Sequence, residues 1–338
     1  MPAFNVAIAD SVLTPGLRAD FISAYDAAYQ GMYAELSKIA DLEKPSDKRT
    51  EIYAYFNASP HPKFWPSGAP IPEDTYDSVQ FSCTNLKWGL RVNWKTEDQE
   101  DDQIGGLFQR VRDTGTHFGL LDERVIFQML LGTTDSDLLP FIPNAPDGVG
   151  LFSAVDGAGN ARFGATGGNI VAGAGIGSPQ DVKTSIYRAL VRMGLFQDGR
   201  GQPMWGSALM KSEIVLVYAM ANDEVVRTAV ETSLMAQAIQ NIAATENVGG
   251  AAIENILKKG GFRFILTPTQ RITDNYIRVF ATAAPHKPFF VQKRTGLEET
   301  IATRENSDQV RTTDNAYAQW RTRKGYGLFL PYQCALVQ

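Results

Sequence analysis

The feature that most constrains this chain is an alternation of apolar and polar side chains over residues 86–95, LKWGLRVNWK. The apolar positions include Trp88 and Trp94, and lysine, arginine, asparagine and glycine fill the positions between. Because successive side chains of a β-strand point to opposite faces, the pattern predicts a strand with one apolar and one solvated face.

A second strand is predicted just upstream, where Val79, Phe81 and Cys83 alternate in the same way. We expect the two strands to pair as an antiparallel hairpin that turns near residues 84–85. Before them, residues 59–72 contain five prolines, which fix φ and remove backbone donors, so neither a helix nor a central strand is expected there.

A two-stranded arm has no core of its own, so its apolar face needs cover from the chain itself or from a neighbouring subunit. The residues expected to make a subunit contact are Trp65, Trp88, Leu90 and Trp94.

Two long helices are predicted in the first half of the chain. Residues 14–41 carry aromatic and aliphatic side chains three and four positions apart, which is typical of a helix with one apolar face. Residues 97–131 have the same periodicity, and Thr96 with Gln99 forms a capping box at the start. The acidic run EDQEDD over residues 97–102 falls in the first turn, where the helix dipole favours carboxylates. A helix of roughly 35 residues would be about 52 Å long and would act as a spine for other elements.

The second half mixes helix and strand signals, which predicts an α+β fold. Its first segment, residues 156–178, is rich in glycine and is expected to be a flexible loop. A helix over 179–196 with an N-cap at Ser178, a buried strand over 213–219 and a helix over 223–241 should follow. Further strands are predicted in FRFILT, YIRVFATA, PFFVQKR and GYGLFLPYQCAL.

Composition narrows the class of protein. A chain of 338 residues with 44% hydrophobic and 20% charged residues is expected to fold into two joined domains, or into one elongated domain with excursions. No apolar run is long enough to span a membrane, and the N-terminus lacks a secretory signal pattern. Two distant cysteines indicate neither a disulfide framework nor a thiolate metal site, and point to synthesis in a reducing cytoplasm.

Charge is distributed unevenly within a net charge of −5. Residues 258–294 hold eight basic side chains and one acid, whereas residues 97–102 hold five carboxylates. We expect the two regions to meet between subunits, where charge complementarity fixes orientation more than affinity. The residues assigned to this contact are Glu97, Asp101, Asp102, Lys258, Lys259, Arg263, Arg271 and Arg278.

Motifs for chemistry are weak, and we predict no catalytic, cofactor-binding or metal-binding residue. GSPQDVKT at residues 177–184 resembles a phosphate-binding loop but has Val182 where the second glycine belongs, so it is better explained as a helix start. GAGIGS, at residues 173–178, lacks the last glycine of a dinucleotide fingerprint. The three histidines are far apart in sequence and have no neighbouring ligand at metal-binding spacing. The acidic run could bind a hard cation, but capping of a helix explains it better.

The sequence resembles the Mu-like major head subunit family, gpT, whose members have the Hong Kong 97-type capsid fold. The likeness is carried by YDSVQFSCTNLKWGLRVNWKTEDQEDDQIGGLFQRV at residues 76–111, by KPFFVQKRTGLEET at 287–300 and by DNAYAQWRTRKGYGLFLPYQCAL at 314–336. The resemblance implies an N-terminal arm and helix over 1–59 and an extended hairpin loop over 60–95. It also implies a peripheral domain with the spine helix over 96–178, an axial domain over 179–285 and C-terminal strands that return to the peripheral domain over 286–338.

This resemblance implies a phage major capsid protein without cofactors, assembled in the host cytoplasm and resident in the virion. The implied partners are further copies in hexamers and pentamers, a portal, a scaffold, a decoration or cement protein, and packaged double-stranded DNA contacted non-specifically. No membrane is implied. Two alternatives stay open from the residues alone: an encapsulin-like nanocompartment shell, and an enzyme with a scattered site that motifs do not reveal.

Overall fold

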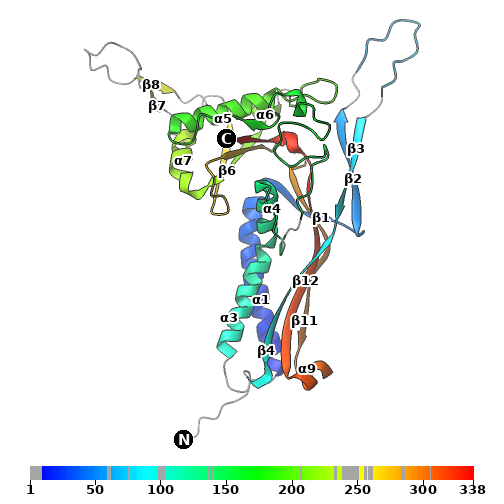
Figure 1. Cartoon of the computed structure of the whole chain (residues 1–338), viewed down its shortest axis with the longest axis vertical. Coiled ribbons are helices and arrows are strands. Elements are labelled where there is room, and N and C mark those ends of the chain that lie inside the picture. The colour runs from blue at the N-terminus through cyan, green and yellow to red at the C-terminus, as the bar shows by residue number, and fades with distance from the viewer. Residues whose placement is uncertain are drawn as a thin grey trace. The chain divides into compact units, whose positions relative to one another are not determined.

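The computed structural model describes residues 10–58, 62–74, 77–97, 104–135, 137–138, 141–205, 208–231, 234–237, 251–254, 257, 262–282, 286–304 and 306–338. The chain forms two compact units, each assembled from distant segments (Figure 1). Unit 1 comprises Met1–Glu51, Ser82–Ile126 and Phe290–Tyr326, and unit 2 comprises Ile52–Phe81, Phe127–Phe289 and Gly327–Gln338.

Unit 1 is a helical layer packed on one face of a four-stranded sheet. The sheet has the order β1-β11-β12-β4, formed by Ala40–Pro45, Phe289–Ala302, Asn315–Leu328 and Leu86–Lys95. The helices α1 (Asp10–Leu36) and α3 (Ile104–Gly119) lie side by side along it. The short helix α9 (Asp308–Thr313) joins β11 to β12.

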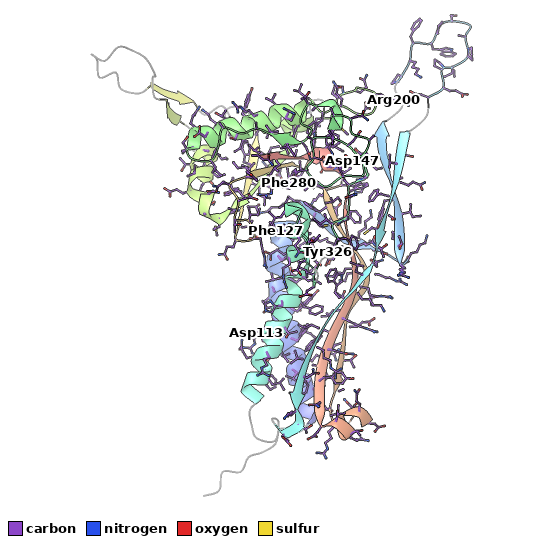
Figure 2. All side chains as sticks on the ribbon, in the orientation of Figure 1. Asp113, Phe127, Asp147, Arg200, Phe280 and Tyr326 are labelled. Carbon is purple, nitrogen blue, oxygen red and sulfur yellow. The ribbon has the colours of Figure 1, made fainter. Side chains whose placement is uncertain are left out.

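Small residues let α1 and α3 approach closely. A Cβ on Gly115 would lie 2.6 Å from the carbonyl oxygen of Phe21, and one on Gly119 would lie 2.7 Å from the carbonyl oxygen of Tyr25. From the first pair to the second, the residue numbers increase along both helices, so α1 and α3 run in parallel. Asp113 lies on the exposed side of α3 (Figure 2), where it accepts a hydrogen bond from the Gln109 amide.

The buried core of unit 1 is largely aromatic. Phe21 of α1 stacks on Trp320 of β12 with ring centroids 4.1 Å apart, and Tyr25 continues the stack along the helix. The predicted aromatic stripe of the first helix is therefore its packing face. The cluster consists of Leu17, Phe21, Trp94, Leu107, Val111, Phe118, Ala302, Val310, Ala316, Ala318 and Trp320.

The predicted hairpin between residues 79–83 and 86–95 is wrong. The strand β3 (Asp77–Thr84) pairs with β2 (Thr50–Ala58), whereas β4 pairs antiparallel with β12, more than two hundred residues later. Alternation predicts a strand and its faces, but it carries no information about which strand supplies the partner. The arm is thus a β2–β3 ribbon, and the described residues 62–74 between its strands form no helix or strand, as the prolines predict.

The bounds of both predicted long helices differ in the structure. The first begins earlier, at Asp10, and ends earlier, at Leu36, so that its expected last turn instead leads into β1. The expected spine is divided at Leu120 into α3 and α4 (Leu121–Leu131). Gly119, at the break, is a residue type at which helices commonly kink. Residues 98–103, which include Gln99 of the capping box and most of the acidic run, lie outside the described residues.

Unit 2 contains a five-stranded sheet of order β5-β13-β10-β6-β9. Its strands are Ile170–Val171, Cys334–Val337, Ile277–Ala281, Glu213–Ala219 and Arg263–Thr269. Every residue of β10 is buried, and β6 is buried beyond its first residue. The C-terminal strand β13 pairs antiparallel with β10, so the C-terminal strands divide, with β11 and most of β12 in unit 1 and β13 in unit 2. The five-segment domain division inferred from the resemblance stays a prediction.

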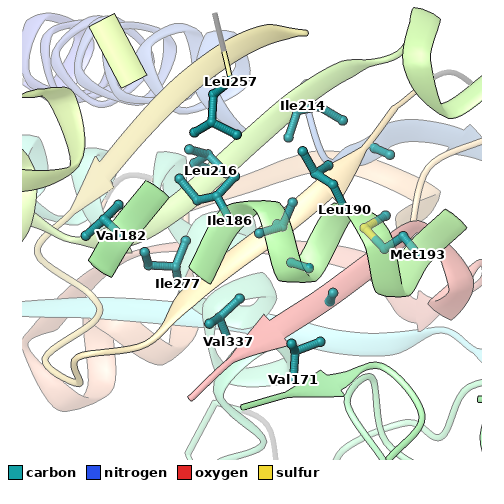
Figure 3. Close-up of a cluster of buried hydrophobic side chains, with 14 of the residues drawn as sticks. Val171, Val182, Ile186, Leu190, Met193, Ile214, Leu216, Leu257, Ile277 and Val337 are labelled. Carbon is teal, nitrogen blue, oxygen red and sulfur yellow. The ribbon is translucent and has the colours of Figure 1, made fainter. Parts of the chain in front are cut away.

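The helix α5 (Pro179–Gly194) covers this sheet with one apolar face (Figure 3). Val182, Ile186, Leu190 and Met193 lie at helical spacing and pack on the core, which confirms the predicted helix. Ser178 caps it, because its hydroxyl accepts a hydrogen bond from the backbone N–H of Asp181. The segment that resembled a phosphate loop is therefore a capped helix start.

Two other sequence predictions in unit 2 are corrected. The glycine-rich segment 156–178 is not a plain flexible linker, because it contains the helical turn η1 (Arg162–Gly164) and the sheet strand β5. Its glycines at 159, 164, 167, 168 and 175 have positive φ, so they form turns that other residues adopt with strain. The helix α7 (Asp223–Glu231) ends ten residues before the predicted end, and β7 (Leu234–Gln237) follows.

The remaining elements are short. They are α6 (Ala208–Lys211), η2 (Met220–Asn222), η3 (Pro331–Gln333) and β8 (Ala251–Glu254), which pairs antiparallel with β7.

Candidate assembly surface

The arm presents large apolar side chains to solvent. Phe64 is 87% exposed and Trp65 is 55% exposed in the proline-rich segment, and Ile71 is 69% exposed. Ile52 on β2 and Val79 on β3 are exposed as well. We call these five residues the arm patch. Exposed apolar side chains gathered on one projection mark an interaction surface.

Local contacts give the proline-rich segment a defined shape. The Trp65 indole N–H donates to the carbonyl of Ala69 at 2.5 Å, which closes a turn. Asp74 accepts a hydrogen bond from the Arg200 guanidinium at 2.6 Å, and the Lys63 ammonium lies 3.6 Å from the same carboxylate oxygen. The aromatic residues of the arm patch therefore lie on a segment with a defined conformation, which lowers the conformational entropy lost on binding.

The structure separates the predicted arm tryptophans into two groups. Trp65 is exposed, as an interface residue should be. Trp88 and Trp94 on β4 are 9% and 6% exposed, and Trp94 belongs to the core of unit 1. The reason for assigning these two to a subunit contact, an apolar face without cover, is wrong, because the helices and β12 of the same subunit cover it. Leu90 on the same strand is 45% exposed, and its role in assembly stays a prediction.

The structure describes only some of the residues of the predicted charged contact, and the contact stays a prediction. Glu97 is exposed, while Asp101, Asp102, Lys258 and Lys259 lie outside the described residues. Arg263 is exposed and lies 3.3 Å from the Glu213 carboxylate, and Arg271 is also exposed.

Arg278 has to be removed from the predicted interface. It is 3% exposed, and its guanidinium donates two hydrogen bonds to Asp274, at 3.0 and 2.6 Å. A buried guanidinium needs a carboxylate partner to offset the loss of hydration, and Asp274 supplies one within the same subunit. Arg278 therefore stabilises the fold at the start of β10.

Sequence reasoning missed most of the arm patch. Phe64 and Ile71 lie in a segment treated only as proline-rich, although exposed apolar residues between prolines were a usable signal. It also missed an exposed stripe of Tyr187, Val191 and Leu195 on the outer side of α5. Periodicity shows that α5 is apolar on one face, but not that a second face is partly apolar.

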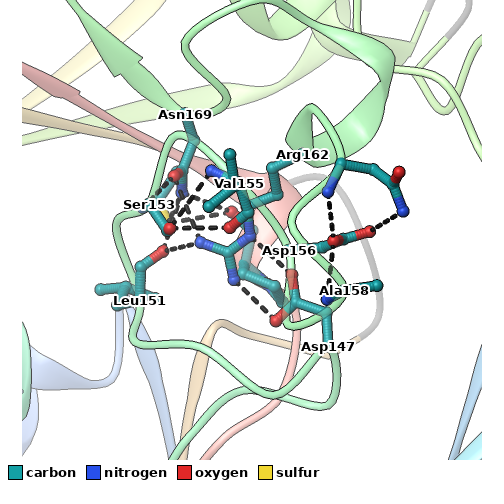
Figure 4. A network of polar contacts seen from close by, with 11 residues as sticks. Asp147, Leu151, Ser153, Val155, Asp156, Ala158, Arg162 and Asn169 are labelled. Carbon is teal, nitrogen blue, oxygen red and sulfur yellow. Dashed lines mark hydrogen bonds and ion pairs between the residues drawn. The ribbon is translucent and has the colours of Figure 1, made fainter.

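A buried arginine organises the loops of unit 2 (Figure 4). Arg162 is 1% exposed and donates to both carboxylate oxygens of Asp147, at 2.6 and 2.9 Å. It also donates to the carbonyl of Leu151 and to Asn169. Asn169 donates in turn to the carbonyls of Leu151 and Pro331. With its hydrogen-bonding groups engaged inside the protein, Arg162 is a structural residue rather than a ligand-binding one.

A cavity of about 150 Å³ lies beside this network, and its carboxylates are already engaged. Asp147 accepts from Arg162, Asp156 accepts from the backbone N–H groups of residues 158 and 160, and Asp198 accepts from those of residues 200 and 202. The hydrogen bonds from the backbone lower the pKa of Asp156. These acids shape turns, which explains them without catalysis.

A second buried ion pair ties α4 to β12 in unit 1. The Lys324 ammonium donates to both carboxylate oxygens of Asp122, at 2.9 and 2.8 Å, and the Tyr326 hydroxyl donates to Asp122 at 2.7 Å. Burial, together with the adjacent Asp122 charge, raises the pKa of Tyr326 well above its ordinary value. The phenol therefore stays protonated and keeps donating to the carboxylate.

The described residues give no sign of metal or thiol chemistry. Cys83 and Cys334 are free and buried, and burial raises the pKa of each thiol to about 12. No group of three or more His, Cys, Asp or Glu in the described ranges could hold a metal ion. Within the same ranges, no helix is long and apolar enough to cross a membrane.

Comparison with known proteins gives one family match. The family model for the Mu-like prophage major head subunit gpT matches residues 14–137. No curated protein gives a significant sequence match.

Among solved structures, the capsid of cyanophage P-SCSP1u is similar with a TM-score of 0.55 at 10% identity, over 88% of this chain and 85% of that chain. The capsid of Myoviridae phage XM1 gives 0.52 at 11% identity, over 89% of each chain. A virus-like particle from Pyrococcus furiosus gives 0.50 at 11% identity, over 94% of this chain and 97% of that chain. At such low identity these likenesses establish the fold, which is that of Hong Kong 97-like capsid proteins.

The fold is shared with a virus-like particle, so it does not by itself separate a phage head from other shells. The sequence match over residues 14–137 is to a head subunit, which favours the phage head. The match and the fold together support a phage major capsid protein of the Hong Kong 97-like fold.

Proposed function

We propose that this capsid protein assembles into hexamers and pentamers of an icosahedral head that encloses double-stranded DNA, by docking its arm on neighbouring copies. The observation that carries the proposal is the arm patch, whose apolar side chains are exposed on a projection without a core of its own. A closed ring of identical subunits needs two different surfaces that meet head to tail. A projecting apolar arm is suited to be one of them.

The remaining partners follow from the proposed head. A head that fills with DNA needs a portal, a scaffold during assembly and, in many cases, a decoration protein on its outside. The family match supports a location in the capsid of the virion, and we propose assembly in the host cytoplasm. No residue in the described ranges is assigned to the portal, the scaffold or the decoration protein.

The test replaces two aromatic residues of the arm patch, Phe64→Ala and Trp65→Ala together. Both side chains are exposed in the subunit, so the variant should fold normally, with an unchanged circular dichroism spectrum and unfolding midpoint. Assembly should be lost or strongly reduced, because aromatic anchors contribute about 2 kcal/mol or more each at interface centres. Sedimentation and negative-stain microscopy measure the particles.

The matched control is Phe141→Ala, which removes another exposed aromatic side chain of unit 2 outside the arm. Particles at wild-type yield from the arm variant would refute docking through the patch. The contents of purified particles separate the nanocompartment alternative, because a head encloses DNA whereas a nanocompartment encloses protein.

A further inference from the structure

The sheet of unit 1 has two faces of opposite character. One face carries Trp94 and Trp320 and packs under α1 and α3. The other carries basic side chains from two neighbouring strands. They are Lys87, Arg91 and Lys95 of β4 with Arg321 and Arg323 of β12, and we call them the basic face.

The strand register places these residues together. In the antiparallel β4–β12 pair, Lys87 lies opposite Arg323 and Arg321 lies opposite Gly89. Arg91 and Lys95 follow at four-residue intervals along β4, about 13 Å apart at the rise of a strand. Because alternate residues share a face, the charges form a double row instead of converging on a point.

Most of this charge is not neutralised within the subunit. Arg321 donates to the Glu298 carboxylate at 2.5 Å. Among the described residues, no carboxylate lies within ion-pair distance of Lys87, Arg91 or Lys95, all of which are exposed. The Arg91 guanidinium carbon lies over the Tyr317 ring, 3.5 Å from its centroid, and the side chain donates to the Asn93 side-chain oxygen at 2.7 Å. Its guanidinium is thereby held in place without a charged partner.

Protection of an open sheet edge does not explain the whole row. Lysine and arginine on an edge strand discourage pairing with other chains, and β4 is an edge strand in this sheet. However, β12 lies between β11 and β4, and it contributes Arg321 and Arg323 to the same face. The ion pair with Glu298 accounts for Arg321, but neither that pair nor edge protection accounts for Arg323.

We propose that the basic face binds the phosphate backbone of double-stranded DNA. The inference rests on the proposed function, in which the head encloses DNA. A double row of separated cations suits a polymer with regularly repeated charge, whereas a small anion needs donors that converge on one point. Such binding needs no groups arrayed for base contacts, since contacts to the DNA backbone carry no sequence information.

The test uses unassembled subunits and a double-stranded DNA fragment, with binding measured by fluorescence anisotropy over a series of salt concentrations. The wild-type affinity should fall as salt rises, and two different fragment sequences should bind alike. The variant Lys87→Gln/Lys95→Gln should reduce the slope of log K against log salt by about 2, because each lost phosphate contact removes about one. Its folding is checked by circular dichroism.

The matched control is Arg110→Gln/Arg124→Gln, which removes the same charge from α3 and α4. This control should keep the wild-type slope. Equal loss in both variants would show an effect of net charge and overturn the proposal, as would unchanged binding in the face variant or no binding by the wild type.

Shell assembly is scored separately by negative-stain microscopy. If the face variant loses shells while its DNA binding is unchanged, the basic face joins copies of the chain and the proposal is overturned. If the wild type forms no shells but shows face-dependent DNA binding, the proposed head function fails and the basic face remains a DNA site.

Discussion

The arm and strand β4 follow each other in the chain and have similar aromatic content, yet the tryptophan of the arm is exposed and those of β4 are buried. Trp65 and Phe64 in the arm are exposed, whereas Trp88 and Trp94 on β4 are buried. The difference comes from what lies over each segment. β4 is covered by helices and pairs with β12, while the proline-rich part of the arm, unable to join a sheet, is left with solvent or a second subunit as its cover.

The comparison shows that aromatic side chains on an apparently extended segment do not reveal whether they stabilise a fold or an assembly. The distinguishing property is whether the backbone can pair. A strand without proline can be recruited into a distant sheet, as β4 is by residues 315–328. A segment with closely spaced prolines cannot, so its apolar side chains are better candidates for contacts between subunits.

The largest effect should come from truncating a buried tryptophan of β4. Trp94→Ala removes a side chain from the core of unit 1 and should lower the free energy of unfolding by about 3–5 kcal/mol. Denaturant unfolding of unassembled subunits, followed by circular dichroism, measures this. Leu90→Ala on the same strand is the control, and its exposed side chain predicts a far smaller loss. Equal losses for the two would mean that β4 is not packed as described.

Particular residues show how far sequence reasoning reaches. The helix at 179–194, its Ser178 cap and the strand at 213–219 depend on local periodicity and capping, and they were predictable. The partner of β4 depends on a residue more than two hundred positions away, and nothing local encodes it. The same limit applies to Arg278, whose burial depends on how β10 sits in the sheet.

Exposure of candidate interface residues was predictable only where prolines prevent the backbone from joining a sheet. Trp65 lies between prolines and is exposed, but Phe64 and Ile71 nearby were overlooked. The role of all three in assembly stays a prediction. Charge alone grouped Arg278 with Arg263, although one is buried in an ion pair and the other is exposed. Counting charges along a sequence does not distinguish a paired internal charge from a surface one.

A smaller effect is expected where the helices over β4 touch each other. Gly119→Ala places a Cβ 2.7 Å from both the Tyr25 carbonyl oxygen and the Ala28 Cβ, so α1 and α3 must move apart. Overpacking of this kind typically lowers the free energy of unfolding by about 1–3 kcal/mol.

Gly106→Ala on the same helix is the control, since a Cβ there meets nothing within 4 Å. It should be neutral or slightly stabilising, because alanine has the higher helix propensity. Thermal unfolding of both variants decides the matter. If Gly119→Ala were as stable as Gly106→Ala, the close contact between the helices would be disproved.

The smallest effect concerns the reactivity of a thiol and should not change the free energy of unfolding at neutral pH. It should locate the boundary between the arm and the covered sheet. Strand β3 is exposed at Val79, while at Cys83 the side chain is buried and its thiol contacts the Tyr326 carbonyl oxygen at 3.4 Å. Burial, only partly opposed by the Lys44 charge, raises the pKa of Cys83 from its ordinary value to about 12. At pH 8 only about one thiol in ten thousand would then be ionised, and the thiolate is the reactive form.

Alkylation of the native subunit at pH 8, with peptide mapping by mass spectrometry, should therefore label a cysteine introduced by Val79→Cys long before Cys83. Unfolding the protein should make both react alike. The stability linked to the Cys83 thiol is full below the ordinary thiol pKa and is lost as the pH rises toward about 12, because the unfolded chain releases the proton first. Equal native labelling at the two positions would place Cys83 on the arm's exposed side and move the boundary toward β4.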